Sequence, residues 1–422
     1  MPKLKGFYNF GVNLDVSESA RVPTEKDDSQ VLITVSQGQE VLGYVAIDST
    51  VGGRSCGGLR MLPDIDEPEM RGLARAMTLK YGFLGLPQGG AKAGVLGDPE
   101  APQTERRKRI EAFGQAIAPL LLSRIYVPGT DMGMDNADIR YMLETVGVKV
   151  KRRELLGTQS GYYTALTVFA GAKQAARFLG LDISDCSVAV EGFGNVGGEL
   201  AELFARLNAR VVAVSTSRGA IFNPEGLDIK RLRGLAAEAG SRAVDLYPDA
   251  ERIDRAALLE LPVDLLCPCA RHHSIHAGNV DRVKARVICA GANNPVTPEA
   301  ERILFERGVQ CLPDFVTNCG GVLGGTMEFA SVSKECIEAF IDRRFGARIA
   351  WLLDEAAKQR TLPRDIAEPL ALSRFDQVRR DACNPTLSSR FFEGGLELYR
   401  RGWVPGGLVA RLSLPYFEKL LA

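Results

Sequence analysis

The sequence lacks a net charge: its 422 residues carry 52 lysines and arginines against 52 aspartates and glutamates. Proteins that bind nucleic acid or an anionic membrane surface usually carry a basic excess, so the balance argues against both kinds of partner. The short basic runs at 106–109 and 149–153 are interpreted as solvated faces. No apolar run approaches the length of a membrane-spanning helix.

Two further features concern the cellular compartment. Residues 1–5, Met-Pro-Lys-Leu-Lys, lack the apolar core of a secretory signal peptide. The nine cysteines are odd in number and scattered, and several lie in apolar, strand-like runs. This distribution is typical of reduced thiols rather than of a disulfide framework, and we expect a cytoplasmic protein.

Glycine is abundant where the chemistry is expected. Residues 85–99 contain five glycines around a single lysine, Lys92. Glycine lets the backbone turn sharply and lets a ligand approach the main chain. A partly desolvated lysine can lose its proton near neutral pH. Lys92 is therefore a candidate base, and the alternative is a glycine-rich turn with an exposed lysine.

The first 150 residues mix strands and helices. Periodicity predicts strands at 31–35 and 41–47 with a turn at Gly38, and helices over 67–80 and 104–118. Residues 52–58 hold so many glycines that they are predicted to be a loop. Residues 126–133 read as a strand that runs into a loop with Asp131. A carboxylate beside Lys92 could relay protons, although an ordinary turn aspartate is the alternative.

The second half has the pattern of a dinucleotide-binding domain. After a linker near 155–160, a long helix is predicted over 161–179. An apolar strand over 187–191 then runs into the glycine pattern Gly-x-Gly-x-x-Gly at 192–197, and a helix follows through Leu207. Between a strand and a helix, this glycine pattern is a good signature of dinucleotide binding. The helix N-terminus would face the phosphates. Further predicted strands alternate with helices and imply a parallel, doubly wound sheet: 210–214, 263–267 and 286–290.

The end of the second strand bears on the cofactor. An acid usually stands there to bind the ribose 2′-hydroxyl of NAD. Residues 214–218 read Val-Ser-Thr-Ser-Arg and contain no acid. Small hydroxyls and Arg218 could hold a 2′-phosphate, so NADP is preferred over NAD. The alternative is that Arg218 points to solvent.

Three segments together carry a family resemblance: Met77-Thr78-Leu79-Lys80, Gly89-Gly90-Ala91-Lys92-Ala93-Gly94 and Asp98-Pro99. They closely resemble the amino-acid dehydrogenase superfamily, the glutamate, leucine, phenylalanine and valine dehydrogenases. The chain is similar to a divergent glutamate dehydrogenase, and the resemblance covers roughly residues 40–330. It fades after about Cys336, and the tail from Cys383 is too irregular to assign.

The resemblance implies a role for individual residues. Lys92 is the catalytic lysine, Asp131 exchanges protons with it, and Lys80 holds the substrate α-carboxylate. The other substrate-binding positions are Cys56, Gly89, Asn318 and Gly325. The cofactor-binding positions are Ser160, Gly192, Phe193, Gly194, Asn195, Val196, Gly197, Thr216, Ser217, Arg218 and Asn293.

Two departures from the family concern the substrate. Glutamate dehydrogenases carry a lysine before Gly-Gly-Leu-Arg, where it grips the side-chain carboxylate, and here that position is Cys56. The family's serine near the same carboxylate corresponds to Gly325. A γ-carboxylate left unpaired in a buried site is costly, which favours an apolar or aromatic substrate. Arg54 in the same loop could resupply the charge, and glutamate is then the alternative.

All three histidines and two cysteines fall within 267–276. These residue types can bind zinc, but their spacing matches no strong zinc pattern, and no metal is expected. A loop that tunes cofactor or substrate contacts is the preferred interpretation.

The sequence therefore predicts a two-domain α/β enzyme. Residues 1–155 would form a substrate-binding and oligomerisation domain, 156–330 a Rossmann-like NAD(P)-binding domain, and 331–422 a helical segment that returns to the first domain. The predicted reaction is reversible oxidative deamination of an L-amino acid to a 2-oxo acid and ammonia, by a homo-oligomer. A catalytically silent relative that binds amino acid or nucleotide is the alternative, although such a protein has no need of Lys80, Lys92 and Asp131 together.

Overall fold

The computed structural model describes the whole chain except residues 1–13, 16–29, 150–158, 385–394, 396–397 and 422. The chain divides into two compact units. Unit 1 comprises Met1–Gly157 and Ala371–Val404, and unit 2 comprises Thr158–Leu370 and Pro405–Ala422. Most of the linker predicted at 155–160 lies outside the described residues.

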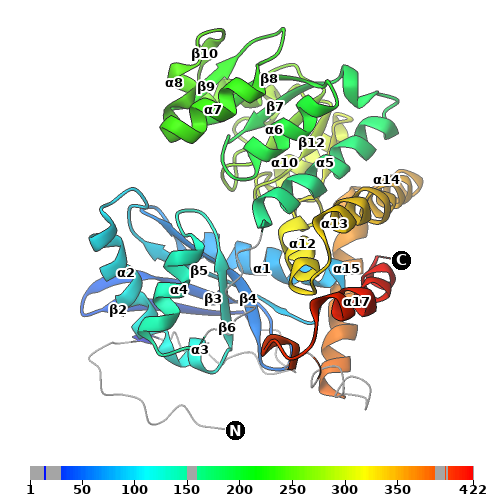
Figure 1. Cartoon of the computed structure of the whole chain (residues 1–422). Coiled ribbons are helices and arrows are strands. Elements are labelled where there is room, and N and C mark those ends of the chain that lie inside the picture. Colours follow the sequence, from blue (N-terminus) through cyan, green and yellow to red (C-terminus); the bar gives the residue numbers. More distant parts are fainter. Residues whose placement is uncertain (1–13, 16–29, 150–158, 385–394, 396–397, 422) are drawn as a thin grey trace. The chain divides into compact units, whose positions relative to one another are not determined.

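Unit 1 is built on a six-stranded sheet of order β1-β2-β3-β5-β4-β6 (Figure 1). Its strands are β1 (Leu14–Asp15), β2 (Val31–Gln37), β3 (Glu40–Ile47), β4 (Ser55–Leu62), β5 (Gly89–Leu96) and β6 (Tyr126–Thr130). β5 runs antiparallel to β3 and parallel to β4, which in turn is parallel to β6. The predicted strands at 31–35 and 41–47 are confirmed, and Gly38 turns between them with a φ of 61°.

Helices cover both faces of this sheet: α1 (Glu67–Leu84), α2 (Gln103–Ala116), α3 (Ala118–Leu122) and α4 (Asn136–Thr145). Side chains alternate between the faces along a strand. β5 therefore places small apolar residues in the core shared with α2 and α4: Ala91, Ala93 and Val95. Its other face is turned to α1, where a Cβ on Gly90 would lie 2.3 Å from Thr78 N and one on Gly94 3.1 Å from Met70 Sδ. Lys92 lies between these two glycines.

The loop predicted at 52–58 is wrong, because β4 begins at Ser55. Only Gly52 and Gly53 form a turn, Arg54 bridges to Val51, and Gly57 and Gly58 belong to the strand. A Cβ on Gly57 would lie 1.6 Å from Ala91 O, and one on Gly58 would lie 2.8 Å from Asp131 Cβ. These glycines let the neighbouring backbone and side chains approach β4 closely, which is a different use of glycine from a turn.

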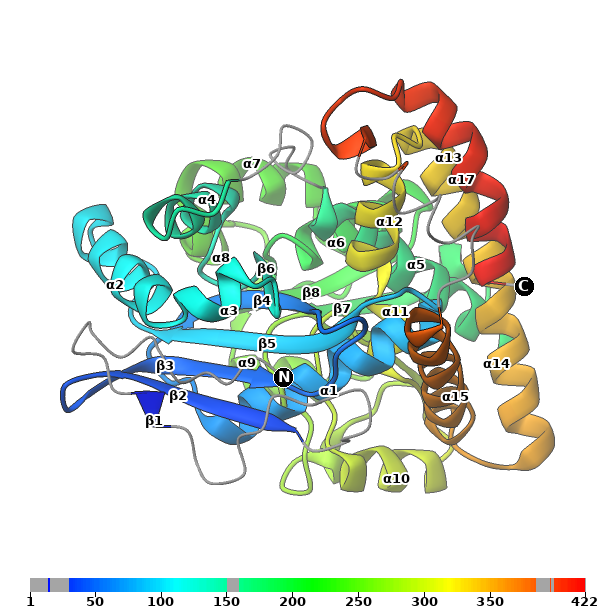
Figure 2. The same ribbon diagram turned by 90° about the horizontal axis from the view of Figure 1, so that it is seen from below.

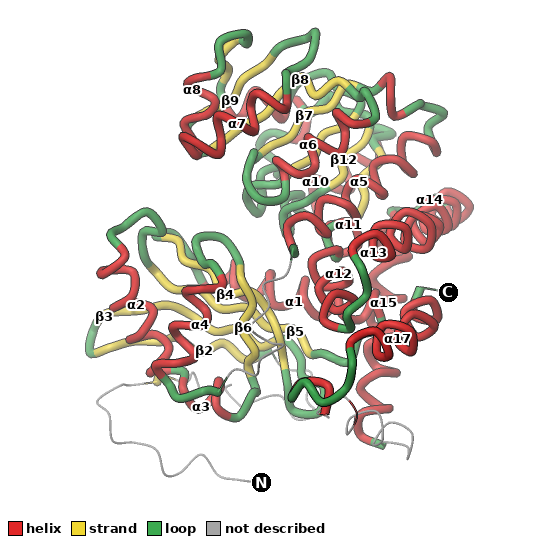
Figure 3. The backbone as a smooth tube through the Cα atoms, viewed as in Figure 1, coloured by secondary structure: helices red, strands yellow, loops and turns green. Residues whose placement is uncertain are grey.

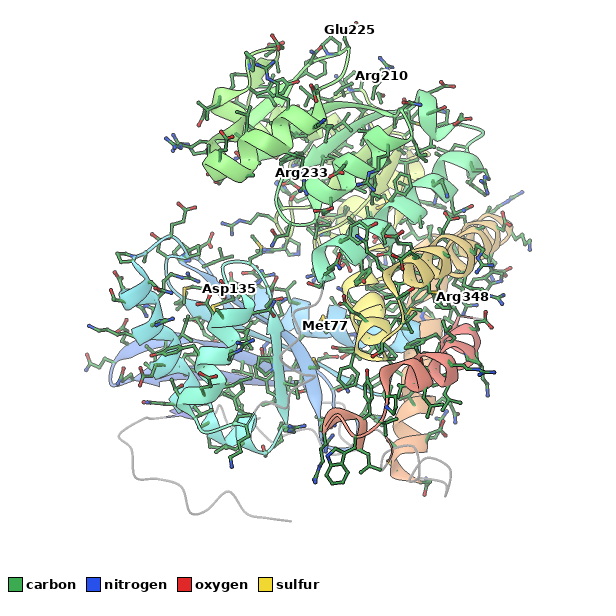
Figure 4. All side chains as sticks on the ribbon, viewed as in Figure 1. Met77, Asp135, Arg210, Glu225, Arg233 and Arg348 are labelled. Carbon is green, nitrogen blue, oxygen red and sulfur yellow. The ribbon has the colours of Figure 1, made fainter. Side chains whose placement is uncertain are left out.

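Helix α1 confirms the predicted helix at 67–80 and continues to Leu84 (Figure 2). Asp66 begins it by accepting a hydrogen bond from Glu69 N, and Gly85 ends it in the left-handed conformation, with a φ of 65°. Met77 and Lys80 are both buried on this helix (Figure 4 labels Met77). Asp135 starts α4 with a reciprocal capping box (Figure 4).

Unit 2 is built on a seven-stranded sheet of order β10-β9-β8-β7-β11-β12-β13 (Figure 3). Its strands are β7 (Ser187–Glu191), β8 (Arg210–Thr216), β9 (Gly219–Phe222), β10 (Glu251–Ile253), β11 (Leu265–Pro268), β12 (Val287–Cys289) and β13 (Gln310–Leu312). Five neighbouring strands of this sheet run parallel, as predicted: β8, β7, β11, β12 and β13. Strands β9 and β10 add an antiparallel edge that the sequence did not predict.

The sheet of unit 2 is surrounded by helices. Up to β13 they are α5 (Ser160–Phe178), η1 (Ile183–Asp185), α6 (Gly197–Arg206), α7 (Ile229–Ala239), η2 (Gly240–Arg242), α8 (Ala243–Leu246), α9 (Arg255–Leu259), η3 (Val280–Arg282) and α10 (Pro298–Glu306). Arg233 of α7 pairs with Glu199 of α6 at 2.6 Å (Figure 4). The predicted long helix and the helix after the glycine fingerprint are confirmed as α5 and α6.

The remaining helices are α11 (Asp314–Thr317), α12 (Gly320–Phe329), α13 (Lys334–Phe340), the π-helical η4 (Ile341–Phe345), α14 (Gly346–Gln359), α15 (Pro363–Cys383) and α17 (Gly406–Leu420). Of residues 331–422, only 371–404 group with unit 1; the rest group with unit 2, and the boundary falls within α15. Arg374 of α15 donates to Phe83 O of α1 at 2.9 Å. No helix among the described residues is both long and apolar enough to span a membrane.

Candidate active site

A buried group of charged side chains lies on the α1 face of the sheet in unit 1. Lys92 projects from β5, and Asp131 follows β6. The ammonium of Lys92 contacts Asp131 Oδ2. Arg60 on β4 donates from Nε to the same oxygen at 3.0 Å. The opposite edge of Arg60 donates from Nη1 to Glu69 Oε1 on α1. Two cations and two anions thus alternate from Lys92 to Glu69.

Lys92 is only 2% exposed, and its amine is easier to deprotonate than that of an ordinary lysine. Burial is the largest cause, and the nearby cations Arg60 and Lys80 act in the same direction. Asp131 opposes them, and the balance lowers the pKa of Lys92 to about 8. The exposed lysine of the alternative interpretation is therefore wrong. A buried amine with this pKa can act as a base near neutral pH.

Asp131 remains a carboxylate. Burial by itself would raise its pKa, but Arg60 and Lys92 outweigh burial and hold the pKa of Asp131 well below its usual range. The glycine at position 58 makes this contact possible, because a Cβ there would lie 3.1 Å from Lys92 Nζ. The pair can pass a proton between the buried amine and a carboxylate that is largely shielded from solvent.

Lys80 is 5% exposed on the last turns of α1 and acts on the charge of Lys92. Residues 89–90 are held to the loop after β3, because Ser49 Oγ accepts from Gly90 N at 2.9 Å and also meets Thr78 Oγ1 at 2.7 Å. A Cβ on Gly89 would lie 2.2 Å from Ser49 O, so this position must stay glycine. The same segment therefore fixes the start of β5 against the helix that carries Lys80.

Cys56 has two buried tyrosines beside it. Tyr81 hydrogen-bonds its thiol, and Tyr126 donates to Gly57 O at 3.2 Å. Burial raises the pKa of all three groups, so the thiol and both phenols are neutral. By contrast the side chain of Arg54 is exposed, and its backbone pairs with Val51.

The glycine fingerprint of unit 2 has the geometry of a phosphate-binding turn. Gly192 has a φ of 91°, and its N–H donates to Ser215 Oγ at 2.9 Å. A Cβ on Gly197 would lie 1.8 Å from Gly192 O, whereas one on Gly194 would meet nothing within 4 Å. The first and third glycines therefore fit the turn and its packing, and the second leaves the backbone open to a ligand. These observations fit a bound dinucleotide.

Three residues within this turn were predicted to contact the cofactor. Phe193 is buried, and its N–H donates to Ser215 O. Val196 precedes α6, and its side chain would lie 3.0 Å from a Cβ on Gly291. Asn195 is exposed. Its backbone would meet a Cβ on Gly161, next to Ser160 at the start of α5.

The end of β8 carries positive charge. Arg218 donates from Nε to Asp245 Oδ2 at 3.4 Å, and Arg252 of β10 pairs with the other oxygen of Asp245 at 2.7 Å. Thr216 is engaged within the loop, since it donates to a backbone oxygen and accepts from Arg218 N at 3.2 Å. Ser217 is exposed. One carboxylate thus serves two arginines, and the arrangement retains an excess positive charge.

A third part of unit 2 places two asparagines together. Asn318 Nδ2 donates to Ala292 O at 2.8 Å and to Asn293 Oδ1 at 3.0 Å. Asn318 is 4% exposed, and its Oδ1 is buried without a hydrogen-bond partner. A buried orphan acceptor of this kind matches an amide N–H₂ of a ligand. Gly325 is half-buried on α12.

The glycines around Asn318 have a packing role. A Cβ on Gly320 would lie 1.8 Å from Tyr163 O, and one on Gly324 would lie 2.3 Å from the Tyr163 ring. Helix α12 therefore lies directly against α5. The close packing fixes the position of Asn318, two residues before the start of α12.

The buried carboxyl group of Glu191 precedes Gly192. Ser274 Oγ donates to it, with 2.9 and 3.0 Å to its two oxygens. Burial raises the pKa of Glu191 to about 7, against this hydrogen bond and the positive charge of Arg255. The segment at 267–276 therefore contacts the start of the glycine fingerprint.

The histidines of that segment make local contacts. The rings of His272 and His273 meet edge to face, with centroids 5.0 Å apart. His276 Nδ1 accepts from Gly278 N at 3.1 Å. Within the part of the chain that the structure describes, no three His, Cys, Asp or Glu side chains are grouped as metal ligands.

Sequence reasoning missed four contributors: Arg60, Glu69, Ser215 and Arg252. The first ends the Gly57–Arg60 run that follows Cys56, but its contact with Asp131 depends on β4 being a strand paired with β6. Glu69 lies nine residues from Arg60 and is turned back toward β4 by the start of α1. Ser215 and Arg252 are placed by the pairing of β8 with β7 and of β10 with β9. No local signal identifies them.

Comparisons with known proteins agree with this geometry. Residues 25–147 match the Glu/Leu/Phe/Val dehydrogenase dimerisation domain, and residues 158–361 match the Glutamate/Leucine/Phenylalanine/Valine dehydrogenase family. The glutamate dehydrogenase of Thermotoga maritima is 37% identical over 315 residues, which cover 71% of this chain and 73% of that protein. An NAD-specific glutamate dehydrogenase of Staphylococcus aureus is 32% identical over 314 residues, 72% of this chain and 73% of its own.

A solved structure is also similar. The hetero-hexameric glutamate dehydrogenase of Thermus thermophilus, in its Leu-bound form, matches with a TM-score of 0.71 at 25% identity and covers 87% of this chain and 92% of that one. The fold and the matched residues define an oxidoreductase that acts on amino acids. The chain belongs to the Glu/Leu/Phe/Val dehydrogenase family.

Proposed function

We propose that this enzyme deaminates an L-amino acid with an uncharged side chain, reversibly and with NADP, to a 2-oxo acid and ammonia. The observation that carries the chemistry is the buried contact between Lys92 and Asp131, with Lys80 close enough to lower the pKa of Lys92. The three side chains provide a base, a proton relay and a cation within one unit.

Each of the three residues takes one role. Lys80 holds the α-carboxylate and thereby fixes which face of Cα is presented for hydride loss. Neutral Lys92 takes a proton from the water that attacks the imine carbon of the oxidised substrate. Asp131 passes protons to and from the substrate nitrogen. Because Lys92 is protonated below a pH of about 8, the amine form that this chemistry needs increases above it.

The dinucleotide would be held by unit 2. Its phosphates fit the turn at 192–197, and Asn318 Oδ1 is suited to accept from the carboxamide. When bound, the nicotinamide supplies the hydride acceptor. Arg218 and Arg252, which share Asp245, favour a 2′-phosphate and hence NADP. NAD is the alternative, and the Staphylococcus aureus relative is NAD-specific by name.

The cofactor preference has its own test. Arg218→Ala combined with Arg252→Ala should raise the KM for NADP by about tenfold or more, since hydrogen bonds to charged groups contribute about 1.5–3 kcal/mol. The KM for NAD should change little. If both KM values rise together, the arginines support the loop and do not select the phosphate.

The substrate preference rests on Cys56. The thiol of Cys56 and the phenols of Tyr81 and Tyr126 are neutral, so these side chains offer no counter-charge to a γ-carboxylate. Small Gly325 likewise provides no hydroxyl. The exposed side chain of Arg54 argues against the glutamate alternative. Glutamate nevertheless belongs in any assay, because the curated relatives are named as glutamate dehydrogenases.

We also propose a cytoplasmic homo-oligomer. The match of residues 25–147 to a dimerisation domain supports self-association. Sedimentation of the purified chain measures the assembly. A monomer at micromolar concentration would contradict it.

The decisive experiment is a deamination screen. Purified protein is mixed with a panel of L-amino acids and either NADP or NAD, and the reduced cofactor is followed by absorbance. Activity on branched or aromatic amino acids with glutamate inactive supports the proposal. Activity on glutamate alone contradicts the substrate proposal, and its loss in Arg54→Ala would identify the resupplied charge. Bound cofactor without any turnover would favour the silent relative.

A further inference from the structure

Arg60 occupies an unusual place for a group outside the proposed catalytic trio. It is 5% exposed, and its guanidinium lies between two carboxylates from different elements. Nε donates to Asp131 Oδ2 at 3.0 Å, and Nη1 donates to Glu69 Oε1. The planar guanidinium can serve both acceptors at once, which the single ammonium of a lysine does less well.

We propose that Arg60 is a positioning residue for the Lys92–Asp131 pair and that Glu69 holds Arg60 in place. The inference rests on the proposed roles of Lys92 and Asp131. Arg60 and Lys92 contact the same oxygen of Asp131, so the carboxylate is held from two sides. Arg60, which does not take part in proton exchange, therefore fixes the direction of the Asp131 carboxylate toward Lys92.

The need for a second cation follows from the chemistry. Whenever Lys92 is neutral, Asp131 loses the positive charge that Lys92 supplied. A buried carboxylate without a counter-charge is costly, and it would recapture the proton from Lys92 or from solvent. Arginine does not deprotonate in proteins, so Arg60 keeps Asp131 paired through the neutral state of Lys92. Arg60 thereby makes the neutral amine accessible.

The charges that face Lys92 come from three elements. Asp131 lies after β6, Arg60 on β4 and Lys80 on α1. Cys56 and Tyr126 also line this region and are neutral. After burial, the two cations lower the pKa of Lys92 while Asp131 raises it. Removing Arg60 should therefore raise the pKa of Lys92, which then binds its proton more tightly.

Glu69 connects this arrangement to α1. It lies in the first turn of α1, where its N–H donates to the Asp66 cap, and it is 6% exposed. Lys80 lies near the other end of the same helix. The Arg60–Glu69 contact thus joins the helix that would bind the substrate carboxylate to the strand beside Lys92.

The test compares Arg60→Gln, Arg60→Lys and Glu69→Gln with a matched control, Arg106→Gln. Arg106 also bridges an aspartate and a backbone oxygen in unit 1, with 2.5 Å to Asp138 Oδ2 and 3.0 Å to Gly133 O. Neither of these contacts involves Lys92 or Asp131. Trace labelling of each protein with acetic anhydride at a series of pH values, read by peptide mass spectrometry, gives the titration midpoint of Lys92 without any assay of turnover.

The expected shifts differ in sign and size. Arg60→Gln should raise the midpoint of Lys92 by about one pH unit and move the rise of kcat/KM to the same higher pH. Arg60→Lys keeps the charge, so its midpoint should stay within about half a unit, while kcat falls several-fold because the fork is lost. Glu69→Gln removes a negative charge and should not raise the midpoint. Arg106→Gln should lower the melting temperature and leave the midpoint unchanged.

Three results would overturn the inference. One is an unchanged Lys92 midpoint in Arg60→Gln. Another, decisive if that variant does not fold, is an Arg60→Lys protein with the kcat and pH profile of the wild type. A midpoint shift of equal size in Arg106→Gln would likewise reduce Arg60 to general support. If wild-type protein reduces neither NADP nor NAD with any amino acid, the proposed function fails, and the labelling result still decides the role of Arg60.

Discussion

The candidate sites of the two units consist of different kinds of chemical group. In unit 1 the site consists of charged side chains, of which Lys80, Lys92, Arg60 and Glu69 are buried and Asp131 is partly buried. In unit 2 the residues suited to a dinucleotide offer mainly backbone groups, glycines and neutral side chains such as Ser215 and Asn318. Ionisable groups stand there in Glu191, before the turn, and in the arginines at the end of β8. The first site depends on proton occupancy, whereas the second depends on backbone shape.

This difference predicts what each site tolerates. A charged group in a dry environment has a shifted pKa, so unit 1 is sensitive to pH and to the removal of one charge. A turn made of glycines does not tolerate an added Cβ, and any pH sensitivity near neutrality is expected from Glu191, which precedes it. A substitution in the turn that shifted the titration of Lys92, or a change of charge in unit 1 that abolished cofactor binding, would contradict this comparison.

The largest effect is expected for Lys92→Ala. Loss of the base should lower kcat by about a thousandfold or more, while the dissociation constant for NADP, measured by fluorescence titration, stays within about twofold because the turn at 192–197 is intact. Lys173→Ala is the control, since this lysine pairs with Asp342 in unit 2. Turnover retained by Lys92→Ala would refute the role of Lys92.

Gly197→Ala should act in the opposite way. Its Cβ would lie 1.8 Å from Gly192 O, so the turn must open. We expect cofactor affinity to fall by about tenfold or more, with a loss of about 1–3 kcal/mol of stability from overpacking. The titration midpoint of Lys92 should not move.

Gly234→Ala provides the control for that substitution. This glycine lies within α7, and a Cβ there meets nothing within 4 Å. It should leave affinity unchanged and add about 0.5–1 kcal/mol of stability. Equal cofactor binding in both alanine variants would show that the turn at 192–197 does not hold the dinucleotide.

Lys80→Gln should have a smaller and more selective effect. Losing a charged hydrogen bond worth about 1.5–3 kcal/mol should raise the amino-acid KM by about 10- to 100-fold. Because Lys80 lowers the pKa of Lys92, its removal should also shift the pH profile upward. A KM that stays at the wild-type value would place the substrate carboxylate elsewhere.

Local pattern predicted much of this molecule. The period of α1, the strand-turn-helix structure around 192–197 and the alternation of strands and helices in unit 2 all have signals within a few residues. Each of these structural predictions is confirmed. The Gly-Gly-Ala-Lys segment pointed to Lys92, and the structure brings Asp131 into contact with it. These are short-range or motif-coded features.

The misses have a common physical cause. Gly57 and Gly58 read as loop residues because their role, admitting Ala91 and Asp131, depends on partners that are distant in the chain. The antiparallel edge formed by β9 and β10 is short and has no alternation to detect. Arg60 and Glu69 carry no chemistry as isolated letters, and only the strand register and the start of α1 bring them together.

The pH dependence of wild-type kcat/KM for oxidative deamination tests the central claim most directly. With the pKa of Lys92 lowered to about 8, the base is mostly protonated at pH 6.5 to 7 and mostly neutral at pH 9. The rate should therefore rise about tenfold per pH unit well below pH 8 and level off above it. A profile that is flat from about pH 6 to pH 9 would contradict a neutral Lys92 as the base, and the account of unit 1 would fail with it.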